Sequence, residues 1–125
     1  MVQVFAKNQT LVCFGTGPVT VYSDPVPLGE SDRLSSISNI HDIDTNSVLG
    51  APQLVYTAQL SNDGGQNYVN SATVTATLLA AGASKVVGAV NAALLRFQFA
   101  LSNPSAGGTD VSAVCFDLHV DFEKA

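Results

Sequence analysis

The sequence predicts an all-β fold, and two runs of alternating residues near the end of the chain are the main reason. Both runs place an apolar side chain at every second position, which gathers these side chains on one face of a β-strand and which no helix reproduces. The other apolar runs are short and are separated by glycine, proline and asparagine, as in a protein of many strands. We expect the alternating side chains to form the core: Phe97, Phe99, Val114, Phe116, Leu118, Val120 and Phe122.

The remaining strands are predicted from shorter runs, at residues 11–14, 19–22, 53–61, 71–79 and 85–90. The segment 33–43 is ambiguous, because its isoleucines and leucine recur at a spacing of three, which hints at a helix. The serines and the asparagine between them are poor residues for a helix interior, so we interpret the segment as a further strand.

Turn signals divide these strands. Glycines and a proline mark 15–18, the Asn-Asp-Gly-Gly cluster marks 62–65, and 103–108 reads as a loop. Two prolines make 23–29 an extended connection. Residues 1–125 are therefore expected to form a single domain, an antiparallel two-sheet sandwich of jelly-roll type with about eight strands.

Composition limits the partners that we expect. The 125 residues are enough for one buried core, and only five are Lys or Arg against ten Asp or Glu, a formal net charge of −5. So few cations would release few counterions from a phosphate backbone, which argues against nucleic acid and anionic membranes as partners. Charged residues are only 12% of the chain, so we expect part of the surface to be buried in a homo-oligomer.

The first part of the chain resembles neither a signal sequence nor a membrane span. It lacks a basic leader followed by an uninterrupted apolar segment, and the apolar stretch 11–22 is broken by Gly15, Gly17 and Pro18. With Met1 at the start, we expect a product that is made in the cytoplasm.

Two cysteines, Cys13 and Cys115, lie near opposite ends of the sequence. We interpret them as reduced and largely packed thiols. In a jelly roll the first and last strands are neighbours, which would bring Cys13 towards Cys115 and make a bridge geometrically possible.

Four pieces of the sequence carry a resemblance. They are the Ser-Asp-Pro-Val-Pro-Leu run at 23–28, the strand and Asn-Asp-Gly-Gly turn at 54–68, the Arg-containing strand at 95–99 and the closing strand at 116–120. Together they resemble small phage-type structural proteins built as β-sandwiches. The resemblance implies a head decoration or minor capsid protein located in the virion, and it implies no catalytic residues.

Candidate metal ligands are few. Asp117, His119 and Asp121 alternate along the last strand and therefore share one face, but neighbours on one face of a strand are about 7 Å apart, which is loose for one ion. His41 beside Asp42 and Asp44 is a similar group. We interpret the first group as polar positions of a half-exposed strand and the second as solvated acids of a loop or strand edge, and we expect no metal.

Signals for catalysis are also missing. The turn at 62–65 has too few acidic residues for a calcium loop, and no serine lies in a nucleophile elbow. The Gly15-Thr16-Gly17 turn is too short to cradle a phosphate. We therefore expect no enzymatic activity and no cofactor.

The expected function is that of a virion structural protein that assembles with itself and with other virion proteins. A carbohydrate-binding, lectin-like module is the alternative, with Tyr22, Tyr56 and Tyr68 as a possible sugar platform. A phage tail or fibre component is a third possibility. The candidate contact residues lie on the threonine-rich strand and on the loop before it: Thr73, Thr75, Thr77, Asp63, Asn67 and Tyr68.

Overall fold

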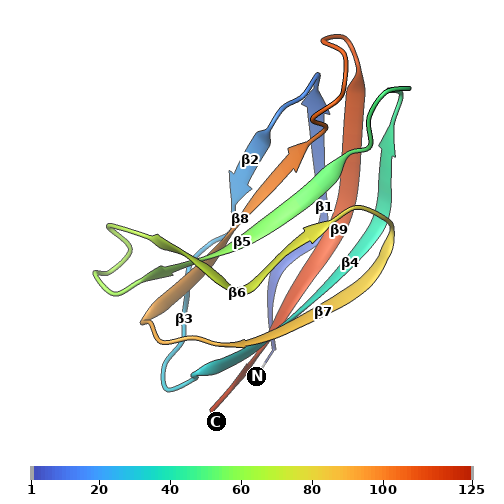
Figure 1. Ribbon diagram of the computed structural model, residues 1–125. Helices are drawn as coiled ribbons and strands as arrows, with labels where there is room; N and C mark the ends of the chain where they lie inside the picture. Colours follow the sequence, from blue (N-terminus) through green and yellow to red (C-terminus); the bar gives the residue numbers. More distant parts are fainter. Residues whose placement is uncertain (1, 125) are drawn as a thin grey trace.

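The computed structural model describes residues 2–124 and confirms the all-β prediction, because these residues form nine strands and no helix (Figure 1). No helix of the described chain is therefore available to cross a membrane. The strands are β1 (Val2–Phe14), β2 (Val19–Tyr22), β3 (Val26–Pro27), β4 (Arg33–Thr45), β5 (Gln53–Ser61), β6 (Val69–Leu78), β7 (Gly82–Ala89), β8 (Leu94–Ser102) and β9 (Val111–Glu123).

The strands form two sheets, one with the order β1-β9-β4-β7 and the other with the order β2-β8-β5-β6. Every pairing is antiparallel, and the two sheets pack face to face as in a jelly roll (Figure 1). The short β3 also pairs with β8, and only three residues separate it from β2. Together β2 and β3 are one interrupted strand, so nine segments fill the eight positions that the sequence predicted.

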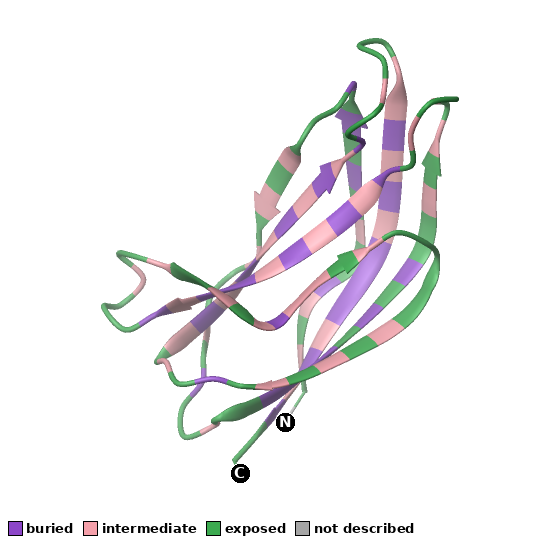
Figure 2. Ribbon diagram, viewed as in Figure 1, coloured by how far each residue is buried: buried purple, intermediate pink, exposed green. Residues whose placement is uncertain are grey.

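The core lies between the sheets and contains all seven side chains predicted from the alternation. Buried and partly exposed residues alternate along β5, β8 and β9 (Figure 2). Aromatic rings join the sheets, since the ring centroids of Phe99 in β8 and Phe116 in β9 are 5.0 Å apart. Phe97 makes an edge contact with Phe5 of β1, also at 5.0 Å.

Tyr56 belongs to this core, so its predicted place in a sugar platform is wrong. Its side chain is 1% exposed, and its hydroxyl lies 3.3 Å from the Ser36 hydroxyl of the opposite sheet. An inward position in the period-two pattern of β5 explains this, because Tyr56 alternates with the outward Val55 and Thr57.

The strand β6 departs from the regular threonine ladder that we expected. Val74 has a φ of 52° and turns its side chain fully into the core, which interrupts the alternation. The Thr75 hydroxyl donates to a carbonyl of its own strand and accepts a backbone N–H of β5. Thr73 packs so closely on β7 that a Cβ at Gly88 would overlap its methyl group. Of the three threonines only Thr77 is exposed.

The prediction that the first and last strands are neighbours is confirmed, because β1 pairs with β9. The two thiols are free and do not face each other. Cys13 pairs with Ser112 and points into the core, whereas Cys115 pairs with Thr10 on the outer side of the sheet. The offset is three residues along the strand, roughly 10 Å, so the register prevents a bridge.

Candidate functional site

Two outer surfaces are available for function, one on each sheet. We call the outer surface of the β1-β9-β4-β7 sheet the β9 face and that of the β2-β8-β5-β6 sheet the β8 face. The β9 face has a buried carboxylate at its centre, whereas the β8 face has an arginine held between two aromatic rings.

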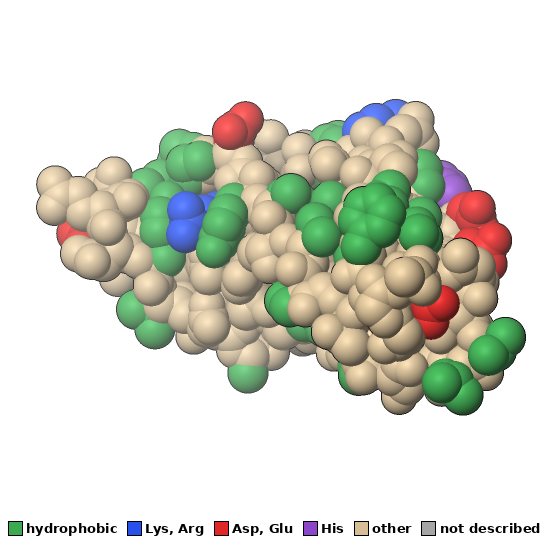
Figure 3. Space-filling view, turned by 90° about the horizontal axis from the view of Figure 1, so that it is seen from above, with side chains coloured by type: hydrophobic (Ala, Val, Ile, Leu, Met, Phe, Trp, Pro, Cys, Tyr) green, Lys and Arg blue, Asp and Glu red, His purple; other side chains and the backbone are tan. Residues whose placement is uncertain are grey.

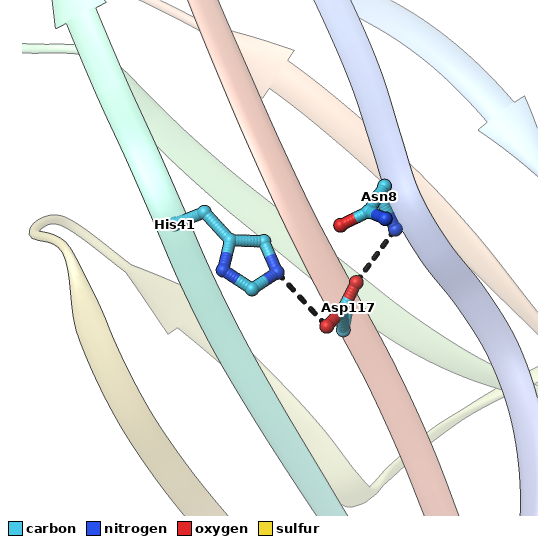
Figure 4. Close-up of polar contacts among 3 residues, drawn as sticks. All are labelled: Asn8, His41 and Asp117. Atoms are coloured by element: carbon cyan, nitrogen blue, oxygen red, sulfur yellow. Dashed lines mark hydrogen bonds and ion pairs between the residues drawn. The ribbon is translucent and has the colours of Figure 1, made fainter.

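Asp117 is the polar centre of the β9 face. Both neighbouring strands bulge at its level, β1 between Ala6 and Gln9 and β4 between Ile40 and Asp42. The bulges direct two donors at the carboxylate, the backbone N–H of Asn8 at 2.6 Å and the Nε2 of His41 at 2.8 Å (Figure 4). A β-bulge re-aims a side chain in this way because its extra residue is unpaired.

The environment keeps the Asp117 carboxylate ionised. The Asn8 N–H holds the pKa of Asp117 below its ordinary value, His41 lowers it further, and partial burial opposes both. Only 9% of the residue is exposed, so these bonds replace the solvation that the charge loses. The cluster is therefore an electrostatic clamp that holds β1, β9 and β4 in register.

The clamp does not form a catalytic triad or a metal centre. No hydroxyl or thiol side chain donates to His41 in residues 2–124, so the histidine has no nucleophile to activate. Within the same residues no three His, Cys, Asp or Glu side chains are close enough together to hold a metal. His119 and Asp121 follow Asp117 on the same face, and Asp42 and Asp44 lie beyond the β4 bulge.

The β9 face also exposes apolar side chains at both of its ends. At one end Val2 is 59% exposed, and at the other Phe14 is 71% exposed. The exposed apolar residues of this face are Val2, Val4, Val12, Phe14, Ile37 and Val87. Apolar groups thus flank the polar clamp on either side.

On the β8 face, Arg96 of β8 is stacked between two tyrosines. Its guanidinium carbon is 4.4 Å from the ring centroid of Tyr22 and 3.7 Å from that of Tyr68. The view from above shows a basic side chain with hydrophobic side chains on both sides of it (Figure 3). We call Arg96, Tyr22 and Tyr68 the arginine slot, and its cation–π contacts fix the orientation of the guanidinium plane.

A hydrogen-bonded network of side-chain amides holds the guanidinium of the arginine slot. Arg96 Nε donates to Gln59 Oε1 at 2.8 Å, and Gln59 is only 8% exposed. Gln59 Nε2 donates to Asn70 Oδ1 at 2.9 Å and to Gln98 Oε1 at 3.4 Å. The arginine is therefore positioned by a buried polar side chain as well as by the two rings.

The structure separates the residues of the predicted loop site. Tyr68 joins the arginine slot, and Tyr22 of the proposed sugar platform meets it there. The Asp63 carboxylate instead accepts the backbone N–H and the side-chain amide of Asn67, at 2.9 and 2.8 Å. Asp63 and Asn67 thus shape the turn.

Sequence reasoning missed Arg96 as a site residue. Its outward position could be read from the alternation with Leu95 and Phe97, which are core. Its contact with Tyr22 and Tyr68 depends on the strand order and on the turn at 62–67, which the alternation does not encode.

A hollow of about 620 Å³ lies beside β7, away from both polar sites. Asp32 and Arg33 line it together with residues 87–91. Asp32 is the carboxylate of this lining, and no histidine, cysteine, serine or threonine accompanies it there.

No protein-family model and no characterised relative matches the sequence. One similar structure is the xylohexaose complex of the CBM22-1 and GH10 modules of the Clostridium thermocellum endo-1,4-β-D-xylanase 10B. It has 11% identity and a TM-score of 0.41, with 83% of this chain and 19% of that chain covered. Another is the structure of infectious bursal disease virus, Gx strain, with 14% identity and a TM-score of 0.47. The match covers 96% of this chain and 31% of that chain. The chain spans less than a third of either structure, and at these scores neither likeness carries a functional argument.

Proposed function

We propose that this protein is a non-catalytic structural subunit that acts by assembling with copies of itself through the β9 face. The finer proposal is a virus particle component of the phage head decoration or minor capsid class. The sequence resemblance supports the class, and one structural observation supports the assembly: the two ends of the β9 face complement each other.

The apolar ends are placed symmetrically about Asp117. Val2 pairs with Asp121 and Val12 pairs with Ala113, and these two partners lie equally far from Asp117 along β9. A two-fold axis across the strands at this level would therefore set Val2 of one copy against Val12 of the other. Phe14 would extend the same apolar contact beyond Val2. Every contact would occur twice, as in an isologous dimer.

Two opposite charges of β4 lie towards the two ends of the same face. Arg33 begins the strand at the Val2 end of the face, and Asp44 lies near the other end, where it pairs with Ala113. The same axis leaves Arg33 of one copy two residues along the strand from Asp44 of the other, about 7 Å, a gap that the long arginine side chain can span. Both residues are exposed, so each is available to a partner. A stable interface of this kind should bury on the order of 1,200–2,000 Å² in total.

The other proposed partners are virion proteins, with neither nucleic acid nor membrane involved. Five Lys and Arg residues against ten acids make a poor surface for either polyanion. A tail or fibre component would use the same face but occupy another place in the particle. Native mass measurement of purified particles tests the class, since a head component should appear as a subunit of 12.9 kDa in many symmetric copies.

Charge reversal tests the assembly directly. We expect light scattering to give a dimer mass or a multiple of it, and Val12→Asp to reduce it to the monomer because a carboxylate would be buried in an apolar contact. Arg33→Glu and Asp44→Arg should each weaken the dimer, and their combination should restore it. Thr77→Glu, on the exposed edge of the other sheet, is the matched control and should leave the mass unchanged.

Two results would overturn the proposal. One is a wild-type monomer at high concentration, and the other is dissociation by Thr77→Glu but not by Val12→Asp. Failure of the double charge reversal to restore a dimer that both single changes weaken would reject the two-fold arrangement.

A further inference from the structure

The arginine slot presents unused hydrogen-bond donors. Arg96 Nε is bonded to Gln59, whereas the two Nη groups have no acceptor in residues 2–124. No carboxylate of this part of the chain forms an ion pair with Arg96. The Tyr22 and Tyr68 rings hold the guanidinium in place, so its free N–H groups are oriented before any ligand arrives.

Arginine determines which atom of each amide in the network donates a hydrogen bond and which atom accepts one. Arginine has donors only, so Gln59 must turn its oxygen to Nε and its NH₂ to Asn70 and Gln98. Asn70 and Gln98 must then use their oxygens to accept. Their NH₂ groups are left over, and neither donates to a side chain or backbone of the described residues. The surface around Arg96 is therefore rich in donors, and a ligand has to bring oxygen acceptors.

The number of positive charges on this sheet limits how many negative charges the ligand can carry. Arg96 is the only Lys or Arg on the described strands of its sheet, because Lys7, Arg33 and Lys85 lie on β1, β4 and β7 and Lys124 follows β9. A single cation suits a single carboxylate, which a guanidinium can bind through two parallel hydrogen bonds. A polyanion would need a row of cations that this face lacks.

We propose that the arginine slot binds the carboxylate of an acidic saccharide, such as a uronic acid residue. The carboxylate binds the two Nη groups, while the amides of Gln98 and Asn70 donate to the neighbouring sugar oxygens. Tyr22 is 53% exposed, so its ring edge and hydroxyl are accessible to the same ligand. The proposal is independent of assembly, because the slot and the β9 face lie on opposite sides of the sandwich.

An acidic peptide is the less suitable ligand for this surface. The side chains that contact Arg96 are the two tyrosine rings and the Gln59 amide, with Gln98 bonded to Gln59 and Leu94 as the outward neighbour on β8. A peptide would be held by apolar anchors or by pairing with a free strand edge, whereas Arg96 lies on β8, between β2 and β5. Sugar hydroxyls and ring oxygens accept hydrogen bonds, so a saccharide can pair with the amide NH₂ groups and tyrosine hydroxyls of this surface.

Calorimetry with defined saccharides tests the proposal. The probes are oligosaccharides that contain glucuronate, galacturonate or mannuronate, each paired with its carboxyl-reduced, neutral counterpart. We expect saturable binding of at least one acidic probe and at least tenfold weaker binding of its neutral counterpart. Arg96→Gln should lower the affinity by about tenfold to a hundredfold, because two charge-assisted hydrogen bonds are lost. Arg96→Lys should be intermediate, since it retains the charge without the fork.

Lys85→Gln is the matched control, since it removes one positive charge from the other sheet and should leave binding unchanged. The carboxyl-reduced probe is tested on the wild-type protein, so the result does not depend on whether an Arg96 variant folds. Binding of a glutamate-rich peptide without any acidic saccharide would overturn the proposal in favour of a protein ligand. Equal affinity for acidic and neutral sugars, or no binding of any probe, would also overturn it.

Discussion

The β9 face and the β8 face belong to different sheets of strands with the same alternating pattern, yet they carry different chemistry. The β9 face has exposed valines and a phenylalanine at both ends of a closed Asp117 clamp, in which the donors and the acceptor satisfy one another. The β8 face has an arginine with unused donors and an amide network that supports it. A satisfied polar cluster holds strands together, whereas an oriented and unsatisfied one is suited to a ligand.

The outer side chains of the two faces can differ because the inner side chains of both sheets form one common core. In a strand every second side chain is committed to the core, and the outward ones are free to vary without loss of packing. Phe116 and Phe14 show this contrast within one sheet, because the first is 1% exposed and the second 71% exposed. The same residue type contributes to folding in one position and is available to a partner in the other.

The largest expected effect is on the free energy of unfolding, and it should distinguish these two phenylalanines. Phe116→Ala should lower the free energy of unfolding by about 3–5 kcal/mol, because it opens a cavity beside Phe99 between the sheets. Phe14→Ala should change it by less than about 0.5 kcal/mol in the monomer. Urea denaturation of both variants measures the difference. Similar losses for both would mean that Phe14 packs within its own subunit.

Most of the fold could be predicted from the sequence because the core residues keep the period of two. The segment 33–43 was ambiguous by spacing, but the serines and the asparagine argued against a helix, and the structure places β4 there. The departures are local. Val74, Asn8 and His41 lie where a strand bulges or adopts an unusual backbone angle, and one to three extra residues leave no signature in an alternating pattern.

The candidate sites were harder to predict because each one joins residues that are far apart in the chain. Tyr22 and Tyr68 were candidates for a sugar platform, but their meeting with Arg96 requires the strand order β2-β8-β5-β6. The alternation assigns a residue to a face without saying which strand lies beside it. Asp117 was considered only with His119 and Asp121, its neighbours on the same strand, whereas its partners come from β1 and β4.

The second prediction tests whether the clamp on the β9 face stabilises the fold. Because the pKa of Asp117 is lowered in the folded protein, chiefly by the Asn8 N–H, its contribution to stability is present above the ordinary carboxyl pKa of about 4. The contribution is lost as the pH falls through the lowered pKa. Asp117→Asn should therefore reduce the melting temperature at pH 7, and the deficit should shrink on acidification.

Thermal melts from pH 7 to pH 2 measure this dependence. Asp42→Asn is the control, because it removes an exposed carboxylate from the same face without touching the clamp. A deficit that is equally large at both ends of the pH range would show that Asp117 acts by its shape rather than by its charge.

The smallest expected effect concerns the turn that carries Tyr68 to the β8 face. The Asn67 backbone N–H, the Asn67 side chain and the Ser61 hydroxyl lower the pKa of Asp63 from 3.8 to about 2. The turn should therefore remain closed above pH 3.8 and loosen as the pH falls through about 2. Asp63 is exposed, so the change should be local, visible in the NMR shift of the Asn67 amide but not in the global melting temperature. Asp63→Asn should abolish the titration, while a midpoint near 3.8 in the wild type would mean that the turn does not hold these hydrogen bonds in solution.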